Sequence, residues 1–95
     1  MVVRVVGEMD RDTAPEVEAA VDEVLGGARV ESVVFDLGGV TFLDSAGIRV
    51  LLTCRELAER AGAGLVVERA HEVVRQVLTI TDLMGVLRVA PAAES

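Results

Sequence analysis

The chain has 95 residues, which is the length of one small domain with a single modest hydrophobic core. Hydrophobic residues make up 52% of the sequence, only two side chains are aromatic, and the formal net charge is −7, with nine Arg and no Lys. This acidity disfavours binding to nucleic-acid phosphates and to anionic membrane surfaces, and it suits a basic protein partner instead.

A strand and then a helix are expected in the first third of the chain. The Val-rich residues 2–6 (VVRVV) predict a strand. Thr13 and Glu16 have the spacing of a capping box, which predicts a helix that begins close to them. Apolar side chains then recur at helical spacing, and Gly26 and Gly27 are expected to end this helix.

The middle of the chain repeats this order. Residues 32–37 (SVVFDL) predict a second strand, which Gly38 and Gly39 are expected to break. A helix is expected to begin near Ser45 and to run to about Ala61.

The last third predicts a strand over residues 65–68, a helix over 71–80 and a short final strand over 84–89. We assign residues 1–90 to one domain and residues 91–95 to a flexible tail. Strands that alternate with helices indicate an α/β domain with a mainly parallel sheet and right-handed crossovers. We therefore expect about four mostly parallel strands and three to four helices.

The corner at Ser45 is the first candidate site. In open α/β sheets, ligands and partners bind at the carboxyl ends of the strands, where both Gly7–Asp10 and the segment before Ser45 are expected to lie. Ser is a favoured helix N-cap, and this structural role would fully explain Ser45. The first turn of a helix also favours a phosphate group, so Ser45 is equally placed for modification, with Asp44 beside it as a repelling charge.

The helix expected after Ser45 has one narrow polar strip and a wide apolar face. Arg49, Thr53, Glu56 and Arg60 form the strip. A helix packed on a sheet needs an apolar stripe only somewhat wider than 100°. Either a partner protein or the neighbouring helices could cover the extra apolar surface.

Other chemistries have weak support in the sequence. Ser45 lies in L-D-S-A-G rather than in the G-x-S-x-G of a nucleophile elbow, and His71 is the only imidazole available as a base. Cys54 falls within a helix pattern and is interpreted as a buried core residue. The carboxylates around the corner (Glu8, Asp10, Asp12 and Asp44) are interpreted as a solvated rim rather than as a magnesium site. We expect no metal and no cofactor.

Three blocks of the sequence resemble a known family. The stretches GEMDRDTAPEV, VVFDLGGVTFLDSAGIRVLL and VVRQVLTITDLMGVL look like the characteristic blocks of the STAS domain family, and in particular of the bacterial anti-sigma factor antagonists. The middle block is the specific one. The resemblance covers nearly the whole chain in the same order and spacing.

The resemblance implies a partner-switching regulator that is not itself an enzyme. The unphosphorylated form would bind an anti-sigma factor, which is also a serine kinase, and would thereby free a sigma factor. Phosphorylation of Ser45 would end this binding, and a serine phosphatase that acts transiently would restore it. Independently of the resemblance, the lone Cys54 and the lack of a signal peptide or a membrane-spanning apolar run predict a reducing cytoplasm, and the acidity predicts no direct contact to nucleic acid or membrane. The implied partner surface consists of Glu8, Asp10, Thr41, Phe42, Asp44, Ser45, Ala46, Gly47, Ile48 and Arg49. The alternative is a STAS interaction subunit of a transport or sensory assembly without a sigma circuit.

The chain departs from the family pattern in three places. The extra N-terminal strand of many relatives is missing, which would leave a sheet edge open to pairing with another chain, so a homodimer is one expectation. Ala46 stands where many relatives carry a second Ser, which leaves one acceptor hydroxyl in the corner. Arg49 lies one helical turn after Ser45, close enough to pair with a phosphate there.

Overall fold

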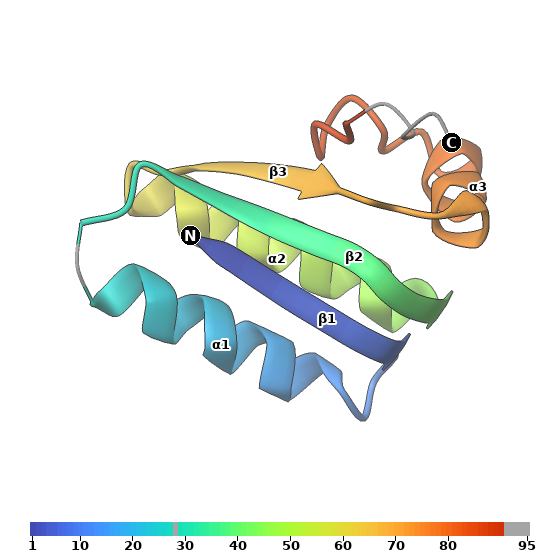
Figure 1. Cartoon of the computed structure of the whole chain (residues 1–95), viewed down its shortest axis with the longest axis horizontal. Helices are drawn as coiled ribbons and strands as arrows, with labels where there is room; N and C mark the ends of the chain where they lie inside the picture. The colour runs from blue at the N-terminus through green and yellow to red at the C-terminus, as the bar shows by residue number, and fades with distance from the viewer. Residues whose placement is uncertain (28, 91–95) are drawn as a thin grey trace.

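The computed structural model describes residues 1–27 and 29–90, and this part of the chain forms three strands and three helices (Figure 1). The tail expected at residues 91–95 lies outside the described residues. The elements in chain order are β1 (Val2–Met9), α1 (Ala14–Gly26), β2 (Ser32–Leu43), α2 (Ser45–Arg60), β3 (Gly64–Glu68) and α3 (Glu72–Ile80). The strands lie in the order β1-β2-β3 and both pairs are parallel, so the predicted α/β class is confirmed.

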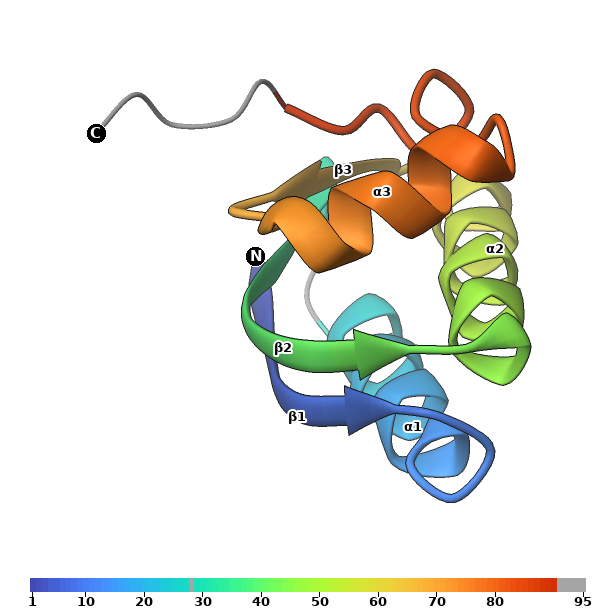
Figure 2. The same ribbon diagram turned by 90° about the vertical axis from the view of Figure 1, so that its right-hand side faces the viewer.

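The helices lie on one side of the sheet (Figure 2). Helix α1 packs on β1 and on α2, α2 packs on β2 and β3, and α3 packs on β2. Side chains from the inner faces of these elements make the core, in which Phe35 of β2, Leu51 of α2 and Leu78 of α3 are fully buried. The apolar, Val-rich strands predicted from the sequence therefore bury one face against helices.

Strand β2 is longer than the sequence predicted. It continues through Gly38 and Gly39 to Leu43, so the expected break there is wrong. A Cβ atom on Gly39 would lie 3.0 Å from Cγ2 of Val6, because β1 and β2 approach each other closely at this point. The register between β1 and β2 shifts twice, between Arg4 and Val6 and between Gly7 and Glu8, and each time the extra residue lies on β2. Gly39 therefore allows the two strands to approach closely, whereas Gly38 leaves space for the side chain of Arg69, and neither glycine ends the strand.

The start of α1 also differs from the prediction. Thr13 is the N-cap residue, but its side chain makes no capping hydrogen bond to the helix, so the predicted capping box is wrong. The Thr13 hydroxyl instead donates to the carbonyl oxygen of Glu8 at 2.9 Å and accepts from the backbone N–H of Asp10 at 3.0 Å. The hydroxyl therefore stabilises the loop between β1 and α1, and it does not bond to the first turn of the helix.

The final strand expected over residues 84–89 is reduced to one bridge, between Val67 of β3 and Val89. The segment before Val89 folds into turns, with backbone hydrogen bonds such as Leu87 N–H to Leu83 oxygen at 3.0 Å. Leu87 is fully buried, so its side chain anchors these turns against the core. The expected four strands are thus three strands and a single bridge in the part of the chain that the structure describes.

The wide apolar face of α2 is covered within the molecule. Ile48 and Leu52 are half-buried and pack against the core, while Leu51 and Cys54 are fully buried. Among the described residues, no large hydrophobic side chain of α2 is exposed. The neighbouring elements therefore cover this apolar face, and α2 needs no partner protein to bury it.

No helix in residues 1–27 or 29–90, α2 included, combines the length and apolar content needed to cross a membrane.

Strand β1 forms one edge of the sheet, and within the described residues it pairs only with β2. Val2 and Val6 of this strand are 58% and 76% exposed. The open edge expected from the sequence is present in this part of the chain, whereas pairing with a second copy stays a prediction.

Candidate functional site

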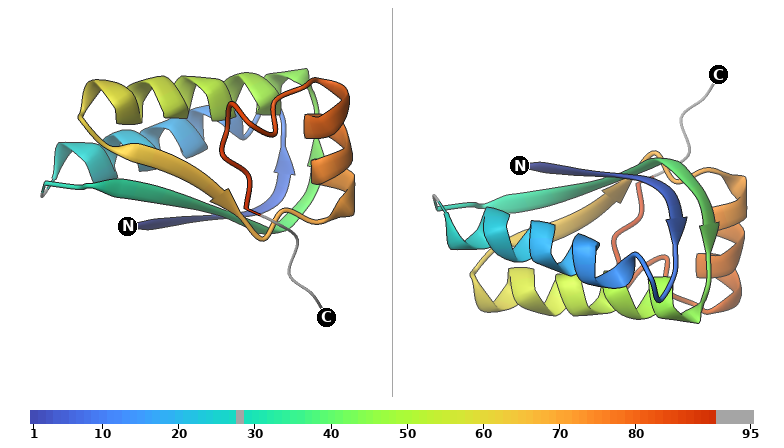
Figure 3. Two further views of the ribbon diagram at one scale, coloured as in Figure 1. Left: turned by 90° about the horizontal axis from the view of Figure 1, so that it is seen from above. Right: turned by 90° about the horizontal axis from the view of Figure 1, so that it is seen from below.

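The carboxyl ends of β1 and β2 lie side by side, as predicted. Glu8 pairs with Phe42 and Met9 with Leu43 in the parallel register, and the backbone N–H of Asp44 donates to the carbonyl oxygen of Met9 at 3.3 Å. The loop that enters α1 and the corner that enters α2 therefore meet at one end of the sheet (Figure 3, right). The two segments that the sequence singled out form one surface.

Helix α2 begins at Ser45, and Asp44 is its N-cap. The Asp44 side chain accepts a hydrogen bond from the backbone N–H of Gly47, with an Oδ1–N distance of 3.0 Å. This bond satisfies one of the free N–H groups at the helix start, which is the role that a capping Ser45 would have filled. The capping interpretation of Ser45 is therefore wrong.

The Ser45 side chain is exposed at the first position of α2. Among the hydrogen bonds within the described residues, none involves its hydroxyl. The hydroxyl therefore stabilises no other group of the described residues, and it faces solvent at the positive end of the dipole of a 16-residue helix.

Gly47 explains how α2 sits so close to the end of β1. Gly47 is buried, and a Cβ atom on it would lie 2.3 Å from the carbonyl oxygen of Met9 and 2.5 Å from Cδ1 of Leu43. Such distances exclude any side chain at this position without movement of the backbone. The glycine therefore allows the short distance between α2 and the strand ends, and its role is in packing.

The loop between β1 and α1 is held by its own polar groups. The Asp10 carboxylate accepts hydrogen bonds from the backbone N–H groups of Asp12 at 2.9 Å and Thr13 at 3.1 Å. Asp10 is half-buried, whereas Glu8 is exposed and, within the described residues, has no ion-pair partner. The two acidic residues predicted as partner contacts thus differ, because the Asp10 carboxylate already shapes the loop and the Glu8 carboxylate is available.

The other predicted surface residues divide by exposure. Thr41, Phe42 and Arg49 are exposed, and Phe42 retains 47% of its accessible surface. Ala46 and Ile48 are half-buried. An exposed phenylalanine is notable here because the chain has only two, and the other, Phe35, is fully buried. Exposed apolar and charged side chains together are typical of a protein-binding surface.

Sequence reasoning missed Arg11. It lies in the loop before α1 and lines a hollow together with Ser45 and Arg49. Its position directly after the Glu8–Asp10 segment was the available signal, because that loop was expected at the same end of the sheet as Ser45.

A second missed residue is Asp36 on the helix-free face of the sheet. It is 9% exposed and accepts from the backbone N–H of Gly38 at 2.9 Å, and its carboxylate oxygens lie 3.3 Å from Nε of Arg4 and 3.4 Å from Nε of Arg69. The Gly38 N–H, and then the two guanidinium groups, hold the pKa of Asp36 below its ordinary value although burial opposes this shift. Asp36 therefore ties β2 to β1 and to the chain after β3. The signal was a carboxylate within an apolar strand run.

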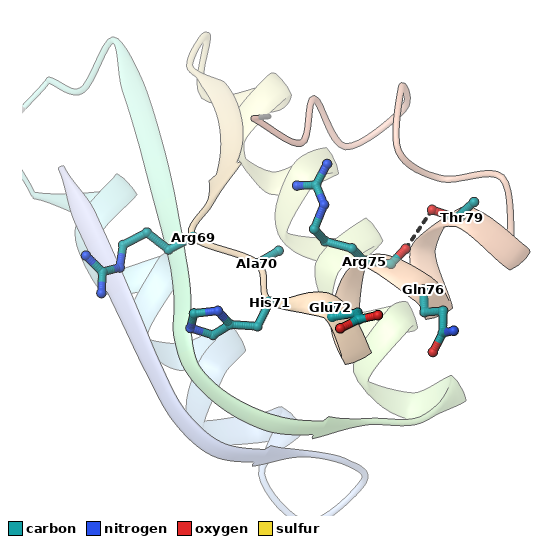
Figure 4. A pocket seen from close by; sticks show the side chains of 7 residues that line it. All are labelled: Arg69, Ala70, His71, Glu72, Arg75, Gln76 and Thr79. Carbon is teal, nitrogen blue, oxygen red and sulfur yellow. Dashed lines mark hydrogen bonds between the residues drawn. The ribbon is translucent and has the colours of Figure 1, made fainter. Parts of the chain in front are cut away.

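Another hollow, at the start of α3, does not form a converging site (Figure 4). In Figure 4 the side chains of Arg69 and His71 extend to one side, and that of Arg75 points in another direction. Arg69 pairs with Asp36, and Arg75 donates from Nη1 to the carbonyl oxygen of Ala90 at 2.8 Å. His71 is the exposed N-cap residue of α3 and lines this hollow, whereas Ser45 lines a different one, with Arg11 and Arg49.

Neither a metal centre nor a reactive thiol is formed by the described residues. Within residues 1–27 and 29–90, no group of three or more His, Cys, Asp and Glu side chains is arranged to hold a metal ion. Cys54 is fully buried, as predicted, and burial raises the pKa of its thiol to about 12.

The whole chain matches one protein family. The model of the STAS domain matches residues 1–95. The chain belongs to the STAS domain family. This result confirms the resemblance of the three sequence blocks and agrees with the fold described above.

Two relatives of this STAS domain near 30% identity are anti-sigma factor antagonists. An anti-sigma F factor antagonist of Paenibacillus polymyxa is 29% identical over 91 residues, which cover 96% of the chain and 75% of that protein. The crystal structure of an anti-sigma factor antagonist from Mycobacterium paratuberculosis is 30% identical, has a TM-score of 0.80, and is matched over 96% of this chain and 76% of that one. The chain is thus a homologue of anti-sigma factor antagonists.

Two further structures share the fold at lower identity. SpoIIAA, a Bacillus cell fate determinant solved in its phosphorylated form, has a TM-score of 0.70 at 20% identity over 98% of this chain and 82% of its own. A sulfate transporter family protein from Wolinella succinogenes has a TM-score of 0.77 at 18% identity over 93% of this chain and 73% of its own. The fold alone therefore occurs in proteins of different function.

Proposed function

We propose that this STAS domain is an anti-sigma factor antagonist that is switched off by phosphorylation of Ser45. The unphosphorylated form binds an anti-sigma factor, which releases its sigma factor in the cytoplasm. The same anti-sigma factor acts as a serine kinase on the antagonist, and a serine phosphatase reverses the modification. The observation that carries this proposal is the exposed Ser45 hydroxyl, which Asp44 relieves of the capping role.

The surface around Ser45 suits a protein partner. Glu8 and Phe42 are exposed neighbours in the β1–β2 register. Both lie near the carboxyl ends of their strands, where the chain enters α2. Phe42 offers an apolar anchor, and the Glu8 carboxylate offers a contact for a basic side chain of the partner. The half-buried Ala46 and Ile48 continue this surface along the first turn of α2.

Phosphorylation would act on this surface by charge. The hydroxyl oxygen of Ser45 attacks the γ-phosphorus of ATP, ADP leaves, and the hydroxyl proton passes to a base of the kinase. The new group adds about −1.5 to −2 charges. A charge that becomes buried in a contact without a partner costs several kcal/mol, and each 1.4 kcal/mol weakens binding about tenfold. Because the helix start stabilises a phosphate, release requires no unfolding of the domain.

The first test is incubation with a candidate anti-sigma kinase and ATP, followed by intact-mass spectrometry. The proposal expects one added phosphate on the wild type and on Ser32→Ala, and none on Ser45→Ala. Ser32 is a matched control because it is also exposed, at the opposite end of β2. Equal phosphorylation of Ser45→Ala would exclude Ser45 as the acceptor.

The second test compares Ser45→Asp with Ser45→Asn in binding to the anti-sigma factor by calorimetry. These variants have the same shape and differ in charge. The proposal expects Ser45→Asp to bind at least about tenfold more weakly than Ser45→Asn, which corresponds to about 1.4 kcal/mol. Equal affinities would contradict release by charge.

The alternative is a STAS subunit of a transport or sensory assembly, and the structural likeness to a sulfate transporter family protein keeps it open at the level of the fold. The two relatives near 30% identity favour the antagonist. The same calorimetry separates the alternatives, because a subunit without a sigma circuit would bind no anti-sigma factor in either form.

A further inference from the structure

Ser45 lies between two hollows of opposite charge. The first, the arginine hollow, is lined by Ser45 and by Arg11, Ala14, Glu18, Ala46, Arg49 and Val50. The second, the aspartate hollow, is lined by Ser45 and by Asp10, Arg11, Asp12, Asp44 and Ala46. The charged side chains of the arginine hollow carry one net positive charge, and those of the aspartate hollow carry two net negative charges. An anionic group attached to the Ser45 oxygen is therefore attracted by the net charge of the arginine hollow and repelled by that of the aspartate hollow.

The two arginines approach this hollow from different elements. Arg49 follows Ser45 by four residues on α2, so the two side chains lie on the same face of the helix, one turn apart. Arg11 comes from the loop between β1 and α1, whose strand end pairs with the end of β2. The start of α2 and the loop before α1 lie next to each other in Figure 2, at the lower end of both helices. The hollow holds about 380 Å³, which is ample room for a phosphoryl group.

Both guanidinium groups are available to a new anion. Arg11 and Arg49 are exposed, and among the described residues neither lies within ion-pair distance of a carboxylate. Other arginines of the chain are already engaged, as Arg4 and Arg69 are with Asp36 and Arg55 is with Glu59. Glu18 shares the arginine hollow, so a single arginine would only balance its charge, whereas two leave a surplus for an anion.

A phosphate on Ser45 therefore has one favourable direction. Towards the aspartate hollow it would meet the carboxylates of Asp10, Asp12 and Asp44, whose repulsion exceeds the attraction of Arg11, the one arginine that also lines that hollow. Towards the arginine hollow it would accept charge-assisted hydrogen bonds from guanidinium groups, whose planar fork matches the oxygens of a phosphate. The choice requires only a rotation of the Ser45 side chain.

We infer that the phosphoryl group of phosphorylated Ser45 is bound within the chain by Arg11 and Arg49. This inference rests on the proposed modification of Ser45 and adds a second component to the switch. Phosphorylation brings negative charge to the docking surface, and it also withdraws two exposed arginines that the unphosphorylated form presents to its partner. The antagonist would thus lose cationic contacts at the same moment as it gains an anionic group.

The test uses full-length protein with phosphoserine installed at position 45 during translation, and it follows the ³¹P NMR signal as the pH is varied. The midpoint of this titration is the second pKa of the phosphate, which is about 6 in an exposed phosphoserine. Arg49→Gln and Arg11→Gln should each raise the midpoint by about half a unit or more, because an opposite charge that favours the dianion is removed. Arg60→Gln, at the far end of α2, should leave the midpoint within about 0.1 unit of the wild type.

Identical midpoints in the wild type and in the Arg11 and Arg49 variants would overturn the inference. Arg49→Lys gives a further readout, because it retains the charge and loses the planar fork, and its midpoint should lie between those of the wild type and Arg49→Gln. Arg11, Arg49 and Arg60 are all exposed, and far-UV circular dichroism should show the wild-type fold in each variant. Because phosphoserine is introduced without a kinase, equal midpoints would reject the arginine contacts alone. Failure of the kinase to modify Ser45 would reject the proposed function alone.

Discussion

Asp44 accepts a hydrogen bond from the backbone N–H of Gly47 at 3.0 Å, and this contact leaves the next residue, Ser45, without a capping role. Because Asp44 caps α2, Ser45 occupies the first helical position with an exposed hydroxyl. A corner that is stabilised by one residue and modified at the next can change its charge without losing its shape.

This division of roles predicts unequal stability effects for two neighbouring substitutions. Asp44→Ala removes the helix cap and should lower the free energy of unfolding by about 1 kcal/mol. Ser45→Ala removes a hydroxyl without a structural partner and should change it by less than about 0.5 kcal/mol. Urea denaturation followed by circular dichroism measures both. If Ser45→Ala proved the more destabilising of the two, the assignment of the cap to Asp44 would be wrong.

Gly47 should be intolerant of even a methyl group. Gly47→Ala places a Cβ atom 2.3 Å from the Met9 carbonyl oxygen, so α2 has to move away from the strand ends, at a cost of about 2–3 kcal/mol. Gly26→Ala is the matched control, because Gly26 is the last residue of α1 and a Cβ atom there meets nothing within 4 Å. The control should be neutral or stabilising by up to about 1 kcal/mol. Equal denaturation midpoints for the two variants would contradict the close packing at Gly47.

Glu8 near the end of β1 and Asp10 in the loop after it should separate binding from stability. Glu8→Gln should weaken binding to the anti-sigma factor and leave the unfolding midpoint unchanged, because Glu8 is exposed and unpaired within the described residues. Asp10→Ala should lower stability by about 1–2 kcal/mol, because the N–H groups of Asp12 and Thr13 lose their acceptor. Calorimetry and thermal unfolding of both variants check this pair. A Glu8→Gln variant that bound as the wild type does would remove Glu8 from the docking surface.

Asp36 makes stability depend on pH in the acid range. Its pKa is lower in the folded protein than its ordinary value of 3.8, so the ionised carboxylate stabilises the fold above that value. This contribution is lost as the pH falls through the folded-state pKa. Asp36→Asn should therefore be less stable than the wild type by about 1 kcal/mol at pH 7, and the difference should shrink below about pH 4.

Asp22→Asn is the control for this prediction, because Asp22 is an exposed carboxylate on α1 that the described residues do not engage in an ion pair. Its stability difference from the wild type should stay near zero across the same pH range. A constant difference between Asp36→Asn and the wild type at all pH values would show that the Asp36 charge does not contribute.

Cys54 should be inert in the folded protein. With a thiol pKa of about 12 and full burial, almost no accessible thiolate is present at pH 8. A chromogenic disulfide reagent should label the native protein only as fast as it unfolds, and should label it within the mixing time in concentrated urea. Rapid labelling under native conditions would mean that the core around α2 opens without unfolding.

Local chemistry in the sequence was enough to predict the class of fold and the end of the sheet at which the two candidate segments meet. The alternation of Val-rich runs with helical stretches predicted parallel strands, because a right-handed crossover helix is the usual way to join them. The D-S-A-G corner and the Glu8–Asp10 segment were predicted to share one end of the sheet, and the register between Glu8 and Phe42 confirms this. Such features depend on residue type and on spacing along the chain.

Contacts between distant segments decided the rest. A pair of glycines has the same letters whether it ends a strand or allows two strands to approach, and only the position of Val6 beside Gly39 distinguishes these cases. Asp44 and Ser45 are both good caps by residue type, and only the structure shows that the Asp44 side chain accepts the hydrogen bond from the Gly47 N–H. Arg11 joins Ser45 and Arg49 because the loop before α1 folds onto the start of α2, which no local spacing encodes. The identity of each residue limits what it can do, and packing between segments selects among those possibilities.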